Sequence, residues 1–322
     1  MIPRLRFAHL PTPIEAMPRL ASALGSKVKL YIKRDDQTGL AMGGNKTRKL
    51  EFLVAEAQAN GARMLISAGA RQSNHCRQVA AAAAHFGLSC TLVLSGEPSM
   101  ESSGNLFLDQ ILGAGIVWTT LENRQATLQD EFNRAWAEGK RPYLIPYGGS
   151  NATGALAYAF AFEEALLQDI QPDWIVFASS SGGTQAGLVL GAQRQDWKGH
   201  ILGISVDEEK SVLQTRVAKL ASEASERLGP RIEIAPETIE VNDRYLGQGY
   251  GMMGNLEKEA IQLFAQNEGI LLDPVYTGRA AGGMIDLIRQ DFFRPGDTIL
   301  FWHTGGTPAL FAAPYTSAIL EE

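Results

Sequence analysis

Short apolar runs alternate with longer amphipathic segments along most of the chain, and this alternation strongly restricts its fold. Runs rich in β-branched and aromatic residues predict strands. Apolar residues at i, i+3, i+4 and i+7, as at Leu50, Leu53, Val54 and Ala57, predict helices. Strands that alternate with helices form mostly parallel sheets covered by helices on both faces, so we expect an α/β protein. The predicted strands are residues 28–33, 64–68, 90–95, 115–119, 143–146, 174–178, 201–206 and 298–303, and the predicted helices are 49–60, 78–86, 128–138, 156–169 and 256–266.

The composition limits the kinds of partner. With 322 residues, the chain can form one large α/β domain or two smaller ones. A net charge of −6 argues against nucleic acid or an anionic membrane as the main partner. The N-terminal residues lack the apolar core of a signal peptide, and no apolar run has membrane-spanning length. The two cysteines, Cys76 and Cys90, suit a reducing compartment, and the scattered histidines argue against structural zinc. We therefore expect a cytoplasmic protein that holds no metal.

Two stretches bear on the organisation of the chain. The sequence PYGGSNATG, residues 146–154, is rich in glycine, serine and asparagine and separates a predicted strand from a predicted helix. Such a stretch is typical of a domain boundary. Residues 207–232 are charged and helix-prone, with no glycine before Gly229, and are expected to form a solvated helical face.

The stretch GLAMGGNKTRKLEFL, residues 39–53, resembles a phosphate-binding P-loop, but Asn45 separates Lys46 from the second glycine. Asn45 is a good helix N-cap, which places Lys46 in the first turn of a helix. The helix dipole disfavours a positive charge there by about 0.3–1 kcal/mol, less than the roughly 1.4 kcal/mol that moves a pKa by one unit. The position favours the free amine, which is the form that attacks a carbonyl carbon. The alternative is a solvated lysine at a helix end.

Polar residues also follow two other predicted strands. In SAGARQSNHCRQ, residues 67–78, a helix begins near Ser73 and Asn74, and its free N–H groups suit a carboxylate or phenolate oxygen. Plain N-capping by Ser73 or Asn74 is the alternative. In SSSGGTQAG, residues 179–187, two glycines and several hydroxyls at a helix start suit a phosphate group without a lysine. A tight turn between strand and helix is the alternative there.

Two tyrosines and a threonine complete the candidate positions. Tyr250 lies between glycines, and Tyr276 precedes a helix of small residues, so either ring can approach a ligand closely or pack in the core. Thr304 follows the last predicted strand and is expected at the carboxyl edge of the sheet, where ligands bind in such folds.

Five of these segments occur together in one enzyme family, in the same order and at similar spacing. KRDDQTGLAMGGNKTRKLEFL, GARQSNHCRQVAA, SSSGGTQAG, DPVYTGRAAGGMIDL and HTGGTPALF resemble the D-cysteine desulfhydrase/1-aminocyclopropane-1-carboxylate (ACC) deaminase family. The resemblance runs from about Thr12 to Phe311. It implies pyridoxal 5′-phosphate (PLP) as cofactor and the fold type II architecture of two α/β domains, each with a mostly parallel twisted sheet flanked by helices. Residues 1–49 and 155–322 would form the large PLP-binding domain, and residues 50–154 the smaller domain.

The resemblance also implies a role for each candidate residue. Lys46 resembles the lysine to which PLP is attached, and Lys46, Ser73 and Tyr276 are the implied catalytic residues. The implied substrate-binding residues are Gln72, Ser73, Asn74, His75 and Tyr250. The implied cofactor-binding residues, besides Lys46, are Asn74 at the phenolic oxygen, Ser181, Gly182, Gly183 and Thr184 at the phosphate, Tyr276 facing the pyridine ring and Thr304 near its nitrogen. Family habit implies a homodimer that acts on a small amino acid.

One position separates the subgroups of the family. ACC deaminases have glutamate after the tyrosine of DPVY, whereas Thr277 follows Tyr276 here, as in D-cysteine desulfhydrases. A hydroxyl cannot hold a pyridine nitrogen protonated as a carboxylate does. We therefore expect β-elimination from a small β-substituted amino acid, giving pyruvate, ammonia and sulfide. L-cysteate sulfo-lyase or ACC deaminase activity on the same fold is the alternative within the family.

Other functions remain as alternatives. Arg71 replaces an uncharged residue of the family and could bind a second anionic group, such as the sulfonate of cysteate, or could point to solvent or pair with a carboxylate. Outside the family, the chain could be a nucleotide-binding protein that uses residues 39–47 as a P-loop. It could also be a catalytically silent PLP-binding protein.

Overall fold

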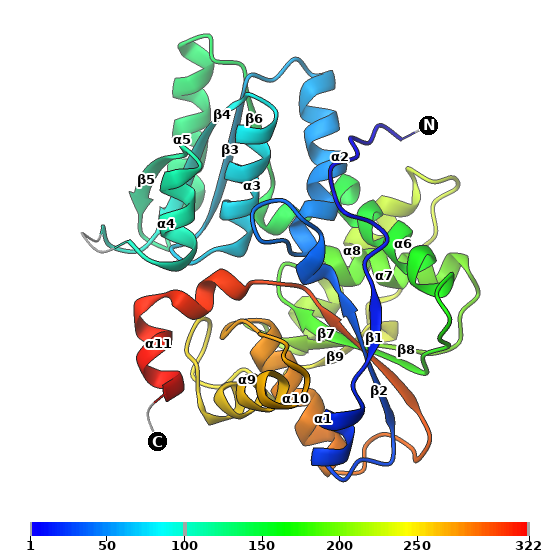
Figure 1. Cartoon of the computed structure of the whole chain (residues 1–322). Helices are drawn as coiled ribbons and strands as arrows, with labels where there is room; N and C mark the ends of the chain where they lie inside the picture. Colours follow the sequence, from blue (N-terminus) through cyan, green and yellow to red (C-terminus); the bar gives the residue numbers. More distant parts are fainter. Residues whose placement is uncertain (1, 99–101, 321–322) are drawn as a thin grey trace.

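The computed structural model describes residues 2–98 and 102–320, and the chain forms two separate β-sheets within them (Figure 1). The larger sheet has the strand order β1-β2-β10-β7-β8-β9. Its strands are β1 (Ile14–Ala16), β2 (Lys29–Arg34), β7 (Trp174–Ser179), β8 (His200–Ser205), β9 (Glu240–Asn242) and β10 (Thr298–His303). All neighbouring strands in it are parallel except β1, which runs antiparallel to β2.

The smaller sheet is entirely parallel and has the order β5-β4-β3-β6. Its strands are β3 (Met64–Ala70), β4 (Ser89–Ser95), β5 (Gly115–Thr119) and β6 (Pro142–Leu144). In the view of Figure 1 this sheet and its helices lie above the larger sheet. The α/β fold with mostly parallel sheets is confirmed.

Helices cover both faces of each sheet, as the alternation of side chains along buried strands requires. In β10, Ile299 and Phe301 pack with α1 (Pro18–Ala23), α9 (Asn255–Glu268) and α10 (Thr277–Arg289). Leu300 and Trp302 point to the other face and pack with α6 (Ala152–Leu166) and α7 (Gly183–Arg194).

The smaller sheet follows the same rule. Its two faces pack against α2 (Asn45–Ala59), α3 (Asn74–His85) and α4 (Gly104–Ile111) on one side and α5 (Arg124–Ala137) on the other. The remaining helices are α8 (Lys210–Ser225) and α11 (Ala313–Leu320).

The eight predicted strands are all present, with ends that differ from the prediction by no more than two residues. Strands β1 and β9 were missed because each has only three residues, IEA and EVN, and neither is an apolar run. The predicted helix within residues 207–232 is α8, but it is not simply solvated. Leu213, Val217 and Ala221 are buried against α6 and α7.

The predicted domain limits at residues 49–50 and 154–155 stay a prediction. The strands of the smaller sheet all come from between these limits, and the strands of the larger sheet all come from outside them. Within the described residues, no helix is both long and apolar enough to cross a membrane.

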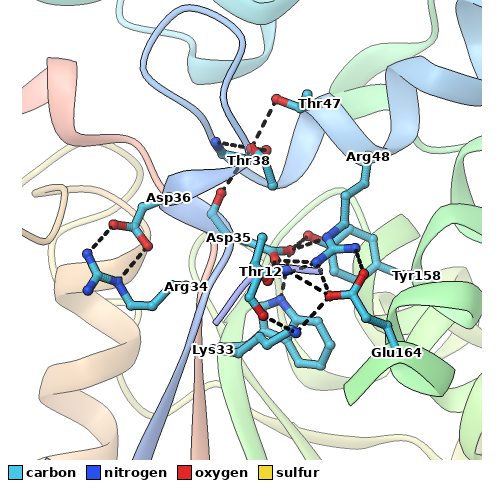
Figure 2. A network of polar contacts seen from close by, with 12 residues as sticks. Thr12, Lys33, Arg34, Asp35, Asp36, Thr38, Thr47, Arg48, Tyr158 and Glu164 are labelled. Atoms are coloured by element: carbon cyan, nitrogen blue, oxygen red, sulfur yellow. Dashed lines mark hydrogen bonds and ion pairs between the residues drawn. The ribbon is translucent and has the colours of Figure 1, made fainter. Parts of the chain in front are cut away.

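A buried polar network fixes the start of α2 to the larger sheet (Figure 2). Asp35, which follows β2, accepts hydrogen bonds from the Arg48 guanidinium at 2.8 and 2.9 Å and from Trp302 Nε1 at 2.9 Å. It also accepts hydrogen bonds from the Thr12 and Tyr158 hydroxyls. Burial alone would raise the pKa of Asp35, but the Arg48 guanidinium outweighs it and holds the pKa below its usual value.

The same network continues to a second carboxylate. Arg48 donates two hydrogen bonds of 2.8 Å to Glu164, and Lys33 donates one of 2.7 Å to it. Because Arg48 lies two residues after Lys46, the network fixes the helix turn that carries Lys46.

Candidate active site

The ends of several strands and the starts of the helices that follow them meet around one cavity. Such a convergence at carboxyl edges of parallel strands is where α/β proteins bind ligands. Its lining includes most of the residues singled out in the sequence: Lys46, Ser73, Asn74, His75, Ser181, Gly182, Thr184, Tyr276 and Thr304. It also includes Asn45, Ser179 and Ser180, which lie in the segments singled out but had no assigned role there, and Tyr147, Gly148 and Ala178, which the sequence did not indicate as site residues.

Asn45 links the start of α2 to Thr304 and to Thr184, which line the same cavity. Its backbone N–H donates to the Thr304 carbonyl at 2.9 Å, and its side-chain amide donates to Thr184 Oγ1 at 3.1 Å. The expectation that Asn45 caps α2 is wrong, because Gly44 occupies the N-cap position and Asn45 is the first helical residue. Gly44 has a φ of 125°, a conformation that glycine adopts readily. The extra asparagine thus joins the start of α2 to two other parts of the cavity.

Lys46 lies on the cavity wall, and a second lysine, Lys49, lies one turn further along α2. Lys49 is fully buried, and Lys46 is partly buried in the cavity wall. This burial lowers the pKa of Lys46 to about 8, although a hydrogen bond with Lys49 partly opposes the shift. Burial and the neighbouring Lys46 charge together lower the pKa of Lys49 well below its usual value. A substantial fraction of Lys46 is therefore the free amine near neutral pH. Burial lowers its pKa more than the helix dipole does.

The start of α3 presents polar groups of fixed orientation. Ser73 caps the helix, since its Oγ accepts a hydrogen bond from the Cys76 N–H at 3.1 Å. The Oδ1 atom of Asn74 accepts from Asn105 Nδ2 at 2.8 Å, which leaves its own NH₂ group as the donor toward the cavity.

His75 at the same helix start is neutral. Its Nε2 lies 2.9 Å from Ser67 Oγ, and burial, followed by the nearby lysines, lowers its pKa well below the usual value. A neutral imidazole adds no charge to the cavity.

The start of α7 forms a second polar wall. Gly182 is the N-cap residue with a φ of 82°, which glycine adopts readily, and a Cβ on Gly183 would lie 2.5 Å from Ser150 Oγ and displace that side chain. The first N–H groups of a helix have no acceptor within that helix and favour an anion. Ser150 Oγ joins this wall: it lies 2.8 Å from Ser181 Oγ and accepts from Lys49 Nζ at 3.2 Å.

Two tyrosine hydroxyls meet at one side of the cavity. Tyr276 OH lies 2.6 Å from Tyr250 OH, and burial raises the pKa of both phenols. Tyr276 lines the cavity, whereas Tyr250 and Gln72 line an adjoining hollow. The Gln72 amide is held by Ser103 and Asn105, at 2.9 and 2.8 Å.

Thr277 does not line the cavity. Its hydroxyl donates to Asp273 Oδ1 at 2.8 Å and accepts from the Asp273 N–H at 2.7 Å. Both hydrogen-bonding functions of this side chain are therefore used within the turn before α10. No carboxylate is among the residues that line the cavity, as far as the described chain goes.

Comparison with known proteins decides the family. A family model described as pyridoxal-phosphate dependent enzyme matches residues 5–305. The chain belongs to this enzyme family. D-Cysteine desulfhydrase from Klebsiella pneumoniae (strain 342) is 43% identical to it over 319 residues, which cover 96% of each chain. The D-cysteine desulfhydrase of Salmonella typhimurium is 42% identical over the same 96% of each chain.

Solved structures support the same family assignment. A crystal structure described as an ACC deaminase homologue has a TM-score of 0.90 at 37% identity, over 99% of this chain and 96% of that chain. A fungal L-serine ammonia-lyase from Rhizomucor miehei has a TM-score of 0.67 at 16% identity, over 97% and 98% of the two chains, and shares the fold. The resemblance seen in the sequence is confirmed, and so is PLP as the cofactor.

The cavity of this PLP enzyme fits its cofactor. Lys46 offers an amine with a lowered pKa, and the start of α7 offers N–H groups and hydroxyls suited to a phosphate. The Ser179 hydroxyl lines the cavity and is buried without a hydrogen-bond partner in the described part of the chain. A ligand in the cavity that hydrogen-bonds this hydroxyl would satisfy it.

Some site residues were missed because their sequence context is ordinary. Lys49 falls in a predicted helix, Tyr147 and Ser150 in a predicted boundary loop, and none of them has a motif of its own. The only sequence signal was the spacing of Lys46 and Lys49, three residues apart, which places both on one face of a helix.

Proposed function

We propose that the protein is a PLP-dependent carbon–sulfur lyase that converts D-cysteine and water into pyruvate, ammonia and hydrogen sulfide. Its support is the nearly full-length similarity to D-cysteine desulfhydrases, together with a cavity that holds an amine of lowered pKa and, among the described residues, no carboxylate. When bound, PLP supplies the electron-accepting ring that stabilises negative charge at Cα of an amino acid. The protein residues then have to bind, orient and transfer protons.

Lys46 is the proposed attachment point of PLP and the proposed base that takes the Cα proton. An amine with a pKa of about 8 is present in both protonation states near neutral pH, as proton transfer in both directions requires. The family resemblance also implies a catalytic role for Tyr276. Its raised pKa keeps the phenol protonated, so its proposed role is to face the ring and to donate a hydrogen bond.

The start of α3 is the proposed carboxylate site for the substrate. Ser73 and the N–H groups around Asn74 and His75 offer donors, and a helix N-terminus favours an anion. Neutral His75 can donate or accept a hydrogen bond without competing with Lys46 for a proton. The Asn74 NH₂ group is the proposed donor to the phenolic oxygen of PLP.

The start of α7 is the proposed phosphate site. It comprises Ser181, Gly182, Gly183 and Thr184, with Thr304 proposed near the pyridine nitrogen. We add Lys49, whose Nζ would lie 3.0 Å from a Cβ on Gly183. A phosphate bound there would favour the protonated form of Lys49 and leave Lys46 as the neutral amine of the pair.

The same cavity makes ACC deaminase the less favoured alternative. Opening a cyclopropane ring offers no stable leaving group, and it benefits most from a carboxylate that keeps the pyridine nitrogen protonated. Thr277 stands where that glutamate would be, and its hydroxyl is bonded to Asp273. A thiol at Cβ leaves readily, so β-elimination suits this site better.

Keto-acid analysis of the purified protein tests the proposal. D-Cysteine is expected to give pyruvate, and ACC is expected to give little 2-oxobutyrate, with L-cysteine and β-chloroalanine in the same panel. Borohydride should fix the cofactor to the peptide that contains Lys46. A protein that ignores added PLP, or that releases 2-oxobutyrate faster than pyruvate, would contradict the proposal. The proposal includes a cytoplasmic homodimer, for which light scattering coupled to size-exclusion chromatography is the check.

A further inference from the structure

Asn105, in the first turn of α4, is fully buried and ties that helix to the start of α3. Its Nδ2 group donates to Asn74 Oδ1 at 2.8 Å and to the Gln72 carbonyl at 3.0 Å. Its Oδ1 atom accepts from Arg77 Nε at 2.8 Å. Both hydrogens of the amide and its oxygen are therefore used, as burial of a polar group requires.

The guanidinium of Arg77 decides which way the Asn105 amide faces. An arginine side chain only donates hydrogen bonds, so it has to face the oxygen of an amide and not the nitrogen. Arg77 is fully buried and also donates to the carbonyls of Ala41 and Gly43. These carbonyls belong to the loop before Lys46, and they can only accept. Arg77 is thus held in one place between acceptors from two segments of the chain.

The orientation of Asn105 in turn decides that of Asn74. Because the Asn105 oxygen faces Arg77, its NH₂ group faces Asn74, which has to present its own oxygen there. The Asn74 NH₂ group then lies at the other end of the amide, close to Gly306, where an added Cβ would come within 2.5 Å of Nδ2. The two ends of an amide have nearly the same shape, so the hydrogen bonds and not the packing fix this direction.

We infer that Asn105 is a positioning residue for the cofactor: through the hydrogen-bonded series Arg77–Asn105–Asn74, it holds the NH₂ group of Asn74 toward the phenolic oxygen of PLP. The inference rests on the proposed role of Asn74, because it names what orients that amide. Asn74 lines the cavity and Asn105 does not, so Asn105 acts through Asn74. Since the series begins at the loop before Lys46, one network holds both the lysine segment and the donor.

Asn105→Asp tests the series, because a carboxylate keeps the shape of the amide but only accepts hydrogen bonds. The new carboxylate can still accept from Arg77, but it faces Asn74 with an acceptor. The Asn74 amide is then expected to turn over and to present its oxygen to PLP. The Kd for PLP, measured by absorbance titration of the apoenzyme, should rise about 10- to 100-fold, the usual effect of losing a hydrogen bond to a charged group. Asn133→Asp, exposed on α5, makes the same change of charge outside the site and should bind PLP like the wild type.

A double-mutant cycle with Asn74→Ala separates this role from a structural one and from repulsion between the new carboxylate and PLP. If Asn105 acts through Asn74, Asn105→Asp should change the Kd by less than about twofold in the Asn74→Ala background. Repulsion or loosened packing would weaken PLP binding by the same factor in both backgrounds, and that result overturns the inference. An unchanged Kd in Asn105→Asp or in Asn74→Ala also overturns it.

Urea unfolding of each apoenzyme shows whether the variants fold, and Asn105→Ala replaces Asn105→Asp in the cycle if the latter does not. It adds no charge and leaves the Asn74 amide free to turn, so the Kd should rise about 2- to 10-fold, again only when Asn74 is present. Turnover of D-cysteine by the wild type tests the proposed function separately. Absence of pyruvate would refute that reaction, whereas the PLP titrations alone decide the role of Asn105.

Discussion

Replacing Lys49 by methionine separates a role in cofactor binding from a role in stability. Lys49 is fully buried, and its Nζ donates to the Gly148 carbonyl at 3.1 Å and to Ser150 Oγ at 3.2 Å, next to the first residue of α7. A methionine of similar length fills the space without the amine. If the amine binds the phosphate of PLP, its loss removes a charged hydrogen bond worth about 1.5–3 kcal/mol, or roughly 10- to 150-fold in the apparent Kd.

The free energy of unfolding should respond in the opposite sense. Burial and the nearby Lys46 charge lower the pKa of Lys49, and its hydrogen bonds go to a carbonyl and a hydroxyl rather than to a carboxylate, so its ammonium form is unfavourable in the apoenzyme. The Lys49→Met apoenzyme is therefore expected to be as stable as the wild type or more so. Lys33→Met is the matched control, because Lys33 is equally buried but bonds Glu164 and the Thr12 carbonyl. That variant should lose stability and keep its affinity for PLP.

Two measurements decide between these roles: titration of each apoenzyme with PLP, followed by absorbance, and urea unfolding of each apoenzyme. A Kd for Lys49→Met within about threefold of the wild type, or a loss of stability as large as in Lys33→Met, would refute the proposed role of Lys49.

Three further predictions concern other parts of the same site. The rate at which the apoenzyme incorporates PLP should rise with pH and level off above pH ~8, because the free amine of Lys46 forms as the pH passes its pKa of about 8. A rate that does not change between about pH 7 and 9 would contradict this. Asp35→Asn should lower the free energy of unfolding, measured in urea, by about 3–5 kcal/mol, because it leaves Arg48 buried without one of its carboxylates. The control Asp36→Asn loses a partly exposed ion pair with Arg34 and should cost about 1 kcal/mol. Gly183→Ala should lower the free energy of unfolding by about 1–3 kcal/mol and weaken PLP binding, because its Cβ would lie 2.5 Å from Ser150 Oγ. The control Gly115→Ala has its nearest neighbours at 3.6 Å and should behave like the wild type in both the urea and the PLP titrations.

The sequence predicted the fold well because buried parallel strands are continuous apolar runs with clear ends. The strand at Thr298–His303, for example, has six residues of which five are buried, and both its limits agree with the prediction. Such patterns depend on neighbouring residues alone. Strand β9, with three residues, is defined by pairing with β8, and no local signal marks it.

The candidate site was predicted where a motif carries the chemistry and missed where distant residues meet. Lys46, Asn74 and Thr184 lie in recognisable segments and do line one cavity. The function of Asn45 could not be read from its position at a helix start, because its partners Thr184 and Thr304 lie far along the chain. The lowered pKa of Lys46 likewise results from burial, which only the folded chain provides.

The network around Asp35 has a consequence for the order in which the protein matures. Asp35 and helix α2, which carries Lys46, leave the ribosome early, yet the Trp302 side chain that completes the network follows Asp35 by 267 residues. At about 5–20 residues per second, this partner is synthesised roughly 13–53 s later. The turn that carries Lys46 should therefore stay open to proteases and unable to retain PLP until almost the whole chain has emerged. Limited proteolysis of ribosome-bound chains that end before and after Trp302 would show this difference, and equal protection of the two would argue against it.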